Sequence, residues 1–259
     1  MALKTHYIQK IRPMELASLL KSLLFKKREI LAHGNFKFLL DTYSDFYWNL
    51  YDEQLNELIY DPAFTKFIVN YLQTGDTFVD LGANEGWFSI YAAECVGSTG
   101  KVYSIEPQNR LTNVIETNAK LNSLENIIVL NTAIGEREEY VNITLSPSLN
   151  SGSSSLVKNS RGLFWKKQKT KVQRFDKLFE NEKINHIDLI KIDIEGYEFS
   201  AIKSMEKMLK AKQIKAILVE LHESQLLKLG TSSAEIQSYL AGFGYHSRTL
   251  DNTPYFTYL

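Results

Sequence analysis

Four polar side chains follow two apolar runs in the C-terminal half of the sequence. Asp193 and Glu195 come at the end of the first run, and Glu220 and His222 come at the end of the second. Side chains alternate along a strand, so each pair points to one side, and the four groups converge if the two runs are neighbouring strands. Histidine has a pKa near neutrality, which suits a general base that takes a proton from a hydroxyl group. We therefore expect His222 to be a base held by a nearby carboxylate, and Asp193 to position a donor or an acceptor.

Two alternatives use the same residues. This strand-end cluster, defined as Asp193, Glu195, Glu220 and His222, could bind a divalent metal ion, because carboxylates and histidine at adjoining strand ends are suitable ligands. The sequence contains no ligand spacing of an established type, so we expect no metal. Alternatively, His222 and Glu223 begin a solvated loop and carry no chemistry.

A second candidate site lies earlier in the chain, at the turn GANEG (residues 82–86), which we call the glycine turn. In a doubly wound sheet, such a turn lets a ligand approach the backbone while the next helix presents its amide groups. The dinucleotide fingerprint GxGxxG would require glycine at Asn84 and at Trp87, so NAD fits poorly. Glu106 ends the next apolar run, at the place where an acid accepts hydrogen bonds from ribose hydroxyls, although it could also be a simple turn acid before Pro107. The turn and the acid together predict a site for a ribose-containing ligand.

The elements that position these residues alternate between strand and helix. Five short runs rich in Ile, Val and Leu are typical of a parallel sheet covered on both faces: residues 77–82, 101–107, 126–135, 187–196 and 215–221. Helical periodicity appears at 109–123 and 200–212, which makes the fold an α/β, doubly wound architecture. The runs 244–250 and 255–259, joined by the turn DNTP, predict a C-terminal antiparallel hairpin.

The N-terminal part of the chain differs from the rest. Leucines recur at helical spacing over residues 13–32, and Pro13 suits a first helical turn. That segment is basic, whereas residues 41–61 carry acids and aromatics without Lys or Arg. We therefore expect residues 1–61 to form a helical extension that caps the main domain, residues 62–259, or packs on a second subunit to form a homo-oligomer. Attachment to a membrane surface is the less favoured alternative, because acids lie nearby.

Composition limits the class of protein. The 259 residues are 44% hydrophobic and 23% charged, enough for one substantial core and a small additional domain. Thirty basic residues balance thirty acidic ones, so no overall field favours nucleic acid or membrane partners. Cys95 is the only cysteine, which excludes an internal disulfide and favours a reducing, cytoplasmic location. The apolar run LASLL (16–20) is interrupted at Lys21, so we expect neither a signal peptide nor a membrane span.

Four ordered motifs carry a resemblance to a known family. They are DLGANEG, SIEP, AIGE (133–136) and LIKIDIEGYE (189–198), and in this order and spacing the chain resembles the FkbM family of S-adenosylmethionine-dependent methyltransferases over roughly residues 75–221. The resemblance implies a Rossmann-like, seven-stranded class I methyltransferase fold whose last strand is antiparallel. It also implies S-adenosylmethionine as cofactor and hydroxyl groups, often on sugars or natural products, as the groups that are methylated.

The resemblance further implies roles for single residues. The glycine turn would hold the amino-acid end of the donor, Glu106 would bind the ribose, and the backbone at Thr132 and Ala133 would border the adenine. The full set of expected cofactor-binding residues is Asp80, Gly82, Ala83, Asn84, Glu85, Gly86, Ser89, Glu106, Pro107, Thr132, Ala133 and Asp193. The strand-end cluster supplies the expected catalytic residues, because methyl transfer requires an aligned acceptor oxygen that loses its proton.

The acceptor is less well specified. Residues 150–157 are rich in hydroxyl groups, and residues 158–174 contain seven basic residues, no acid, and the pair Phe164 and Trp165. This connection is either a solvated loop or a lid that closes over an acceptor. We expect a small hydroxylated acceptor and no nucleic acid, because a basic loop without a basic domain gives a small electrostatic footprint. A macromolecular acceptor such as RNA or protein, and a binding protein without turnover, are the alternatives.

Overall fold

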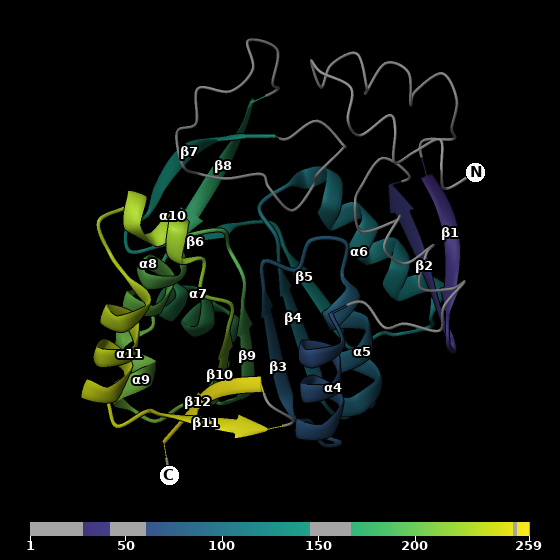
Figure 1. Cartoon of the computed structure of the whole chain (residues 1–259). Helices are drawn as coiled ribbons and strands as arrows, with labels where there is room; N and C mark the ends of the chain where they lie inside the picture. Colours follow the sequence, from purple (N-terminus) through teal and green to yellow (C-terminus); the bar gives the residue numbers. More distant parts are fainter. Residues whose placement is uncertain (1–27, 42–60, 146–166, 251–252, 259) are drawn as a thin grey trace.

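The computed structural model describes residues 28–41, 61–145, 167–250 and 253–258. Its centre is a seven-stranded sheet in the order β11-β12-β10-β9-β3-β4-β5, shown in Figure 1. The strands are β3 (Thr77–Leu81), β4 (Lys101–Ile105), β5 (Ile127–Leu130), β9 (Ile187–Ile192), β10 (Ile214–Val219), β11 (His246–Leu250) and β12 (Thr253–Thr257). Strand β3 pairs in parallel with β4 and β9, whereas β12 runs antiparallel to β10. This arrangement is the class I Rossmann-like methyltransferase fold, so the predicted sheet and C-terminal hairpin are confirmed.

Helices cover both faces of the sheet (Figure 1). They are α4 (Pro62–Tyr71), α5 (Trp87–Val96), α6 (Asn109–Leu121), α7 (Phe175–Glu182), α8 (Glu198–Lys203), α9 (Glu206–Lys210), α10 (Glu223–Lys228) and α11 (Ser233–Gly242). Successive residues of β3 are buried in different layers: Phe78 packs with α4 and α5, and Val79 packs with the layer of α7 to α11. Burial on both sides explains why these strands are rich in Ile, Val and Leu.

The predicted helix over 200–212 is two short helices rather than one. The carbonyl oxygen of Ser204 accepts a hydrogen bond from the backbone amide of Asp176 at 3.1 Å, and the Ser204 hydroxyl accepts one from the amide of Phe175. The first contact takes a carbonyl group that a continuous helix would use, and the chain breaks between α8 and α9.

The predicted strand over 126–135 is also divided. After β5 the chain leaves the central sheet, and β6 (Ala133–Ile134) joins a three-stranded sheet in the order β6-β8-β7, with β7 at Glu139–Thr144 and β8 at Lys167–Gln173. The prediction that residues 158–174 form a loop is therefore wrong for 167–173. The serine-rich residues 150–157, Phe164 and Trp165 lie outside the described residues.

At the N-terminal end, the predicted helix is wrong over residues 28–32. Strands β1 (Arg28–His33) and β2 (Phe36–Asp41) form an antiparallel hairpin there. Phe38 is buried and stacks on Trp87 of α5, with 4.8 Å between ring centroids, so packing on the main domain selects the hairpin. The remainder of the predicted helix, residues 13–27, lies outside the described residues, as do residues 42–60. The domain boundary after residue 61 and the proposed oligomer contact through the N-terminal helices stay predictions.

No helix in the described ranges combines the length and apolar character needed to cross a membrane.

Candidate functional site

The glycine turn connects β3 to α5 with an unusual backbone. Gly82, Asn84 and Gly86 all have positive φ angles, of 83°, 51° and 86°. A β-carbon on Gly82 would lie 1.9 Å from the carbonyl oxygen of Asp193, so only glycine fits at this position. Helix α5 begins directly after Gly86, and its N-terminal partial positive charge therefore lies at the turn.

Glu106 lies against the glycine turn, as the sequence predicts. Its Oε2 accepts a hydrogen bond from the backbone amide of Asn84 at 3.0 Å, and its Oε1 accepts one from the amide of Gln108 at 2.9 Å. The side chain is 4% exposed, and burial raises the pKa of Glu106 to about 7 against the opposing effect of these two hydrogen bonds. The acid is thus held in place by the turn and by the residues that follow β4.

Asp80 and Ser89 support the turn from the protein interior. Both are fully buried, and the Ser89 hydroxyl donates a hydrogen bond to Oδ2 of Asp80 at 2.7 Å. Ser104 of β4 donates in turn to the Ser89 hydroxyl at 2.7 Å. Asp80 and Ser89, both predicted to bind the cofactor, therefore form a polar chain with Ser104 that connects β3, α5 and β4.

Lys191 connects the turn to the strand-end cluster. Its Nζ donates a hydrogen bond to the carbonyl oxygen of Gly82 at 3.0 Å and lies 3.3 Å from Oδ1 of Asp80 and 3.5 Å from Oδ2 of Asp193. Sequence analysis missed this residue. The available signal was a lysine near the end of a strand rich in Ile and Leu that is buried on both faces, where a charge requires partners.

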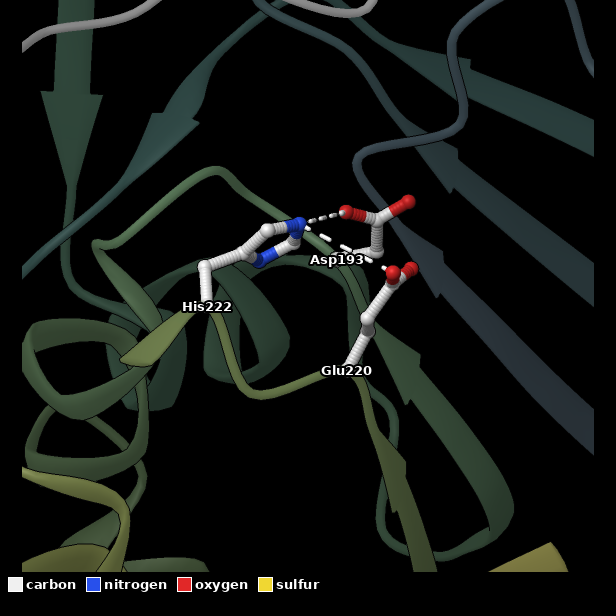
Figure 2. Close-up of side chains that lie close together, drawn as sticks. All are labelled: Asp193, Glu220 and His222. Carbon is white, nitrogen blue, oxygen red and sulfur yellow. Dashed lines mark ion pairs between the residues drawn. The ribbon is translucent and has the colours of Figure 1, made fainter. Parts of the chain in front are cut away.

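Figure 2 shows that the side chains of Asp193, Glu220 and His222 point toward one another. The Nε2 atom of His222 lies 3.7 Å from Oδ1 of Asp193, 3.8 Å from Oε1 of Glu220 and 4.0 Å from Oε2 of Glu195. The predicted convergence is thus present, but strand alternation is not its cause. All four residues follow the last residues of β9 and β10, and Glu195 has a φ of 53°.

The carboxylate that holds His222 is Glu198, at the start of α8, which sequence analysis did not single out. Its Oε1 lies 2.8 Å from Nδ1 of His222 and also accepts a hydrogen bond from the amide of Gly196 at 2.9 Å. This interaction raises the pKa of His222 to about 9, with the nearby acids adding to the effect and burial opposing it. Burial is also the main cause of the raised pKa values of Glu195 and Glu220.

A further acid, Asp61, belongs to the same surroundings. It precedes α4 and caps that helix by accepting a hydrogen bond from the amide of Phe64 at 3.3 Å. Burial raises the pKa of Asp61, and the charges of Lys191 and Asp193 act on it. Sequence analysis gave no sign that this helix cap lies near the cluster.

Thr132 and Pro107, both expected to bind the cofactor, form hydrogen bonds with β8. The Thr132 hydroxyl donates to the carbonyl oxygen of Lys171 at 3.0 Å, so only its backbone remains as the expected contact with an adenine. The carbonyl oxygen of Pro107 accepts from Nε2 of Gln168 at 2.6 Å, and Ala133, the first residue of β6, pairs with Val172. In the turn itself, Ala83 and Glu85 are buried.

One buried atom shows what the turn could bind. Within the described part of the chain, Oδ1 of Asn84 is buried and has no hydrogen-bond partner. A buried amide oxygen requires a donor, and the ammonium group at the amino-acid end of S-adenosylmethionine would supply one. The residues present therefore fit this cofactor, with Glu106 available to ribose hydroxyls.

A family model matches more than half of the chain. Residues 80–247 match the family model of the methyltransferase FkbM domain. Solved structures similar to this chain include a SAM-dependent methyltransferase from Aquifex aeolicus, with 16% identity, a TM-score of 0.44, and coverage of 80% of this chain and 98% of that chain. They also include an rRNA methylase from Streptococcus thermophilus (12% identity, TM-score 0.41, coverage 75% and 93%) and fibrillarin from Aeropyrum pernix with bound S-adenosylmethionine (13% identity, TM-score 0.41, coverage 82% and 74%).

Proposed function

This chain belongs to the FkbM methyltransferase family, and on that premise we propose that it methylates a hydroxyl group of a small acceptor, such as a sugar-containing metabolite. Its methyl donor is S-adenosylmethionine. The donor supplies a methyl group on a sulfonium ion, and transfer of that methyl group to a hydroxyl oxygen leaves S-adenosylhomocysteine and releases one proton.

The observation that carries the proposal is the hydrogen bond between the amide of Asn84 and Oε2 of Glu106. This hydrogen bond connects the glycine turn, which a ligand can approach closely, with a buried acid at the end of the neighbouring strand. In the proposal, Glu106 accepts hydrogen bonds from the ribose hydroxyls and Oδ1 of Asn84 accepts one from the ammonium group. The turn residues then hold the amino-acid end against α5.

The acceptor hydroxyl is proposed to bind at the strand-end cluster. Asp193 is next to the glycine turn, because its amide donates to the carbonyl oxygen of Leu81 at 3.0 Å and its own carbonyl oxygen faces Gly82. A group held by Asp193 therefore lies close to the donor, which is the alignment that an in-line transfer needs.

His222 is the proposed base, but only in its neutral form. Its pKa of about 9 means that most molecules of the ligand-free protein carry a protonated His222 at neutral pH. Glu195 and Glu220 lie within 4.0 Å of Nε2, and their raised pKa values make them better proton acceptors than ordinary carboxylates. The proton of the hydroxyl group is therefore taken up within the cluster.

Calorimetric titration with S-adenosylhomocysteine, run beside NAD, tests the donor site. We expect micromolar binding of S-adenosylhomocysteine alone, at least tenfold weaker in Glu106→Ala, which removes the proposed ribose contact. Glu116→Ala, a matched change on the exposed face of α6, should bind as the wild type does. Binding of NAD, or equal affinity in Glu106→Ala, would contradict the proposal.

The acceptor is tested by measuring S-adenosylhomocysteine formation against a panel of hydroxylated sugars and glycosides. Product that carries a new O-methyl group, identified by mass spectrometry and NMR, supports the proposal. The variant His222→Ala should lose at least a hundredfold in turnover if His222 takes the proton. Near-normal turnover in that variant would remove His222 from the role of base.

A macromolecular acceptor is the second candidate, and one feature of β8 favours it. Lys167, Lys169 and Lys171 alternate along this strand and are all exposed, so they form a basic strip on one face. Contacts of lysines with phosphates weaken as salt rises. Tight, salt-dependent binding of structured RNA that is lost when the three lysines are changed to Gln would favour this candidate over a small acceptor.

A further inference from the structure

We propose that Asp193, Glu220 and His222 bind a divalent transition-metal cation beside the donor site. The role of the cation, to position the acceptor oxygen and lower the pKa of its hydroxyl group, rests on the proposed function, with one change: Nε2 of a metal-bound His222 cannot also take the proton, so the proton passes to Glu195, which is not a ligand. Binding of the cation does not rest on the proposed function, so it can be tested separately.

The geometry of the three side chains is close to that of a metal site. Each offers one ligand atom, and these atoms all lie within 4.8 Å of one another. Figure 2 shows the three side chains turned toward a common point. Ligand atoms about 2.1 Å from a common cation lie about 3.0 to 3.4 Å apart. The distances of 3.7 Å and 3.8 Å from Nε2 of His222 to Asp193 and Glu220 therefore need to shorten by only roughly half an ångström.

Glu198 provides an independent observation that points to a metal ligand at His222. Because its fully buried carboxylate lies 2.8 Å from Nδ1, the ring donates its Nδ1 hydrogen to Glu198 and turns Nε2 toward Asp193 and Glu220. A histidine that binds a metal almost always has such a carboxylate or carbonyl partner on its other nitrogen, which fixes the tautomer and the ring orientation. Neither ligand carboxylate is involved in this contact.

Charge and access also favour a cation. Glu195 adds a third carboxylate near Nε2, whereas Lys191 contacts Asp193 through the other oxygen, Oδ2, and leaves Oδ1 toward the ring. The side chains of Asp193 and Glu220 are 29% and 49% exposed, so a cation can enter from solvent. Three protein ligands leave coordination positions for water or an acceptor oxygen.

The ligand types select the class of metal. One imidazole suits first-row transition metals and zinc, and two carboxylates suit harder cations such as Mn²⁺. This mixed set fits Mn²⁺ or Zn²⁺ better than Mg²⁺, which prefers oxygen ligands alone. Mn²⁺ is the probe of choice, because free and bound ions are distinguished by electron paramagnetic resonance.

The test is a titration of the EDTA-treated full chain with Mn²⁺, both with and without saturating S-adenosylhomocysteine. We expect one saturable Mn²⁺ site per chain. Affinity should fall at least tenfold in Glu220→Gln, which changes a half-exposed side chain and leaves the fold intact, and about 10- to 100-fold in Glu198→Gln. The control Glu180→Gln removes an equal charge from an exposed ion pair on α7 and should leave the affinity unchanged.

The outcomes separate this inference from the proposed function. If no saturable Mn²⁺ site appears under either condition, or if Glu220→Gln binds Mn²⁺ as the wild type does, the metal site is overturned, even when S-adenosylhomocysteine still binds. If Mn²⁺ binds as expected but calorimetry detects no S-adenosylhomocysteine with or without Mn²⁺, the proposed function fails and the metal site stands.

Discussion

The backbone amide of Asn84 donates a hydrogen bond to Oε2 of Glu106 across 3.0 Å, and so joins the end of β3 to the end of β4. From β3 the chain builds the sheet outward through β4 and β5, then returns to add β9 on the other side of β3. The glycine turn therefore lies at the point where the strand order reverses, which is where doubly wound sheets bind their ligands. Asp193, directly after β9, lies next to the glycine turn on the other side of β3.

Donor binding should depend on pH through Glu106. Ribose hydroxyls donate to the ionised carboxylate, and the pKa of Glu106 is about 7, so the affinity for S-adenosylhomocysteine should rise about tenfold between pH 6 and pH 8. The variant Glu106→Gln should bind more weakly and lose most of this dependence. Calorimetric titrations at several pH values measure both, and an identical pH profile in the two proteins would contradict the assignment.

Glu106 should also make the free energy of unfolding depend on pH, in the direction opposite to that of donor binding. Because the pKa of Glu106 in the folded protein lies above its ordinary value of 4.5, the folded state binds the proton more tightly than the unfolded state. This contribution to the free energy of unfolding is present below about pH 4.5 and is lost as pH rises through about 7. Urea unfolding of ligand-free wild type and Glu106→Gln across this range should show the wild type losing stability relative to the variant as pH rises.

The close approach of Gly82 to Asp193 gives a prediction with a matched control. In Gly82→Ala the new β-carbon meets a carbonyl oxygen at 1.9 Å, so the backbone must shift, and we expect a loss of more than about 2 kcal/mol in the free energy of unfolding. Gly230 has a similar φ of 79° but nothing within 4 Å, so Gly230→Ala should cost only about 1 kcal/mol of backbone strain. Chemical denaturation of both variants separates steric overlap from strain, and equal losses would show that the contact with Asp193 is unimportant.

The central sheet could be predicted because its strands are buried on both faces. Strands β3, β4, β9 and β10 are short runs rich in apolar residues, so their sequences indicate strands without knowledge of tertiary contacts. Strand β8, by contrast, is mostly polar, and only Thr170 and Val172 are buried, so its existence depends on pairing with β6 and β7. The hairpin over 28–41 likewise depends on distant contacts.

The parts of the candidate site that depend on local backbone conformation could be predicted from the sequence. The parts that depend on contacts between distant residues were missed. Glycine and asparagine tolerate positive φ angles better than other residues, and Gly82, Asn84 and Gly86 all adopt them. Nothing local to Glu198 indicates that it holds His222, since the two residues come from α8 and from the segment after β10. The predicted convergence of the cluster succeeded because β9 and β10 are neighbours, although the residues lie beyond the strands.

Asn118 should couple the N-terminal hairpin to the glycine turn. Its Oδ1 accepts a hydrogen bond from the amide of Leu39 at 2.6 Å, and its Nδ2 donates to the carbonyl oxygen of Glu85 at 2.9 Å. Asn118→Ala should destabilise the protein by about 1 to 3 kcal/mol, because buried groups lose their partners. Hydrogen exchange should accelerate in β2 and in the turn together. Thr117→Ala, on the same helix with a solvent-exposed hydrogen bond, serves as control, and unchanged exchange in Asn118→Ala would argue against coupling.

Lys191 should be one of the most sensitive positions in the chain, because it is the buried cation beside Asp80. Lys191→Met leaves the fully buried Asp80 without its ion-pair partner, 3.3 Å away, and should cost about 3 to 5 kcal/mol in the free energy of unfolding. Combining Lys191→Met with Asp80→Asn should restore part of that loss, since the uncompensated charge is then removed.

Lys207→Met breaks an exposed ion pair with Glu180 and should cost less than about 1 kcal/mol, which makes it the matched control. Urea unfolding of the double-mutant cycle measures the coupling between the two residues. If Lys191→Met were as mild as Lys207→Met, the ion pair would not be what holds the turn and the cluster together.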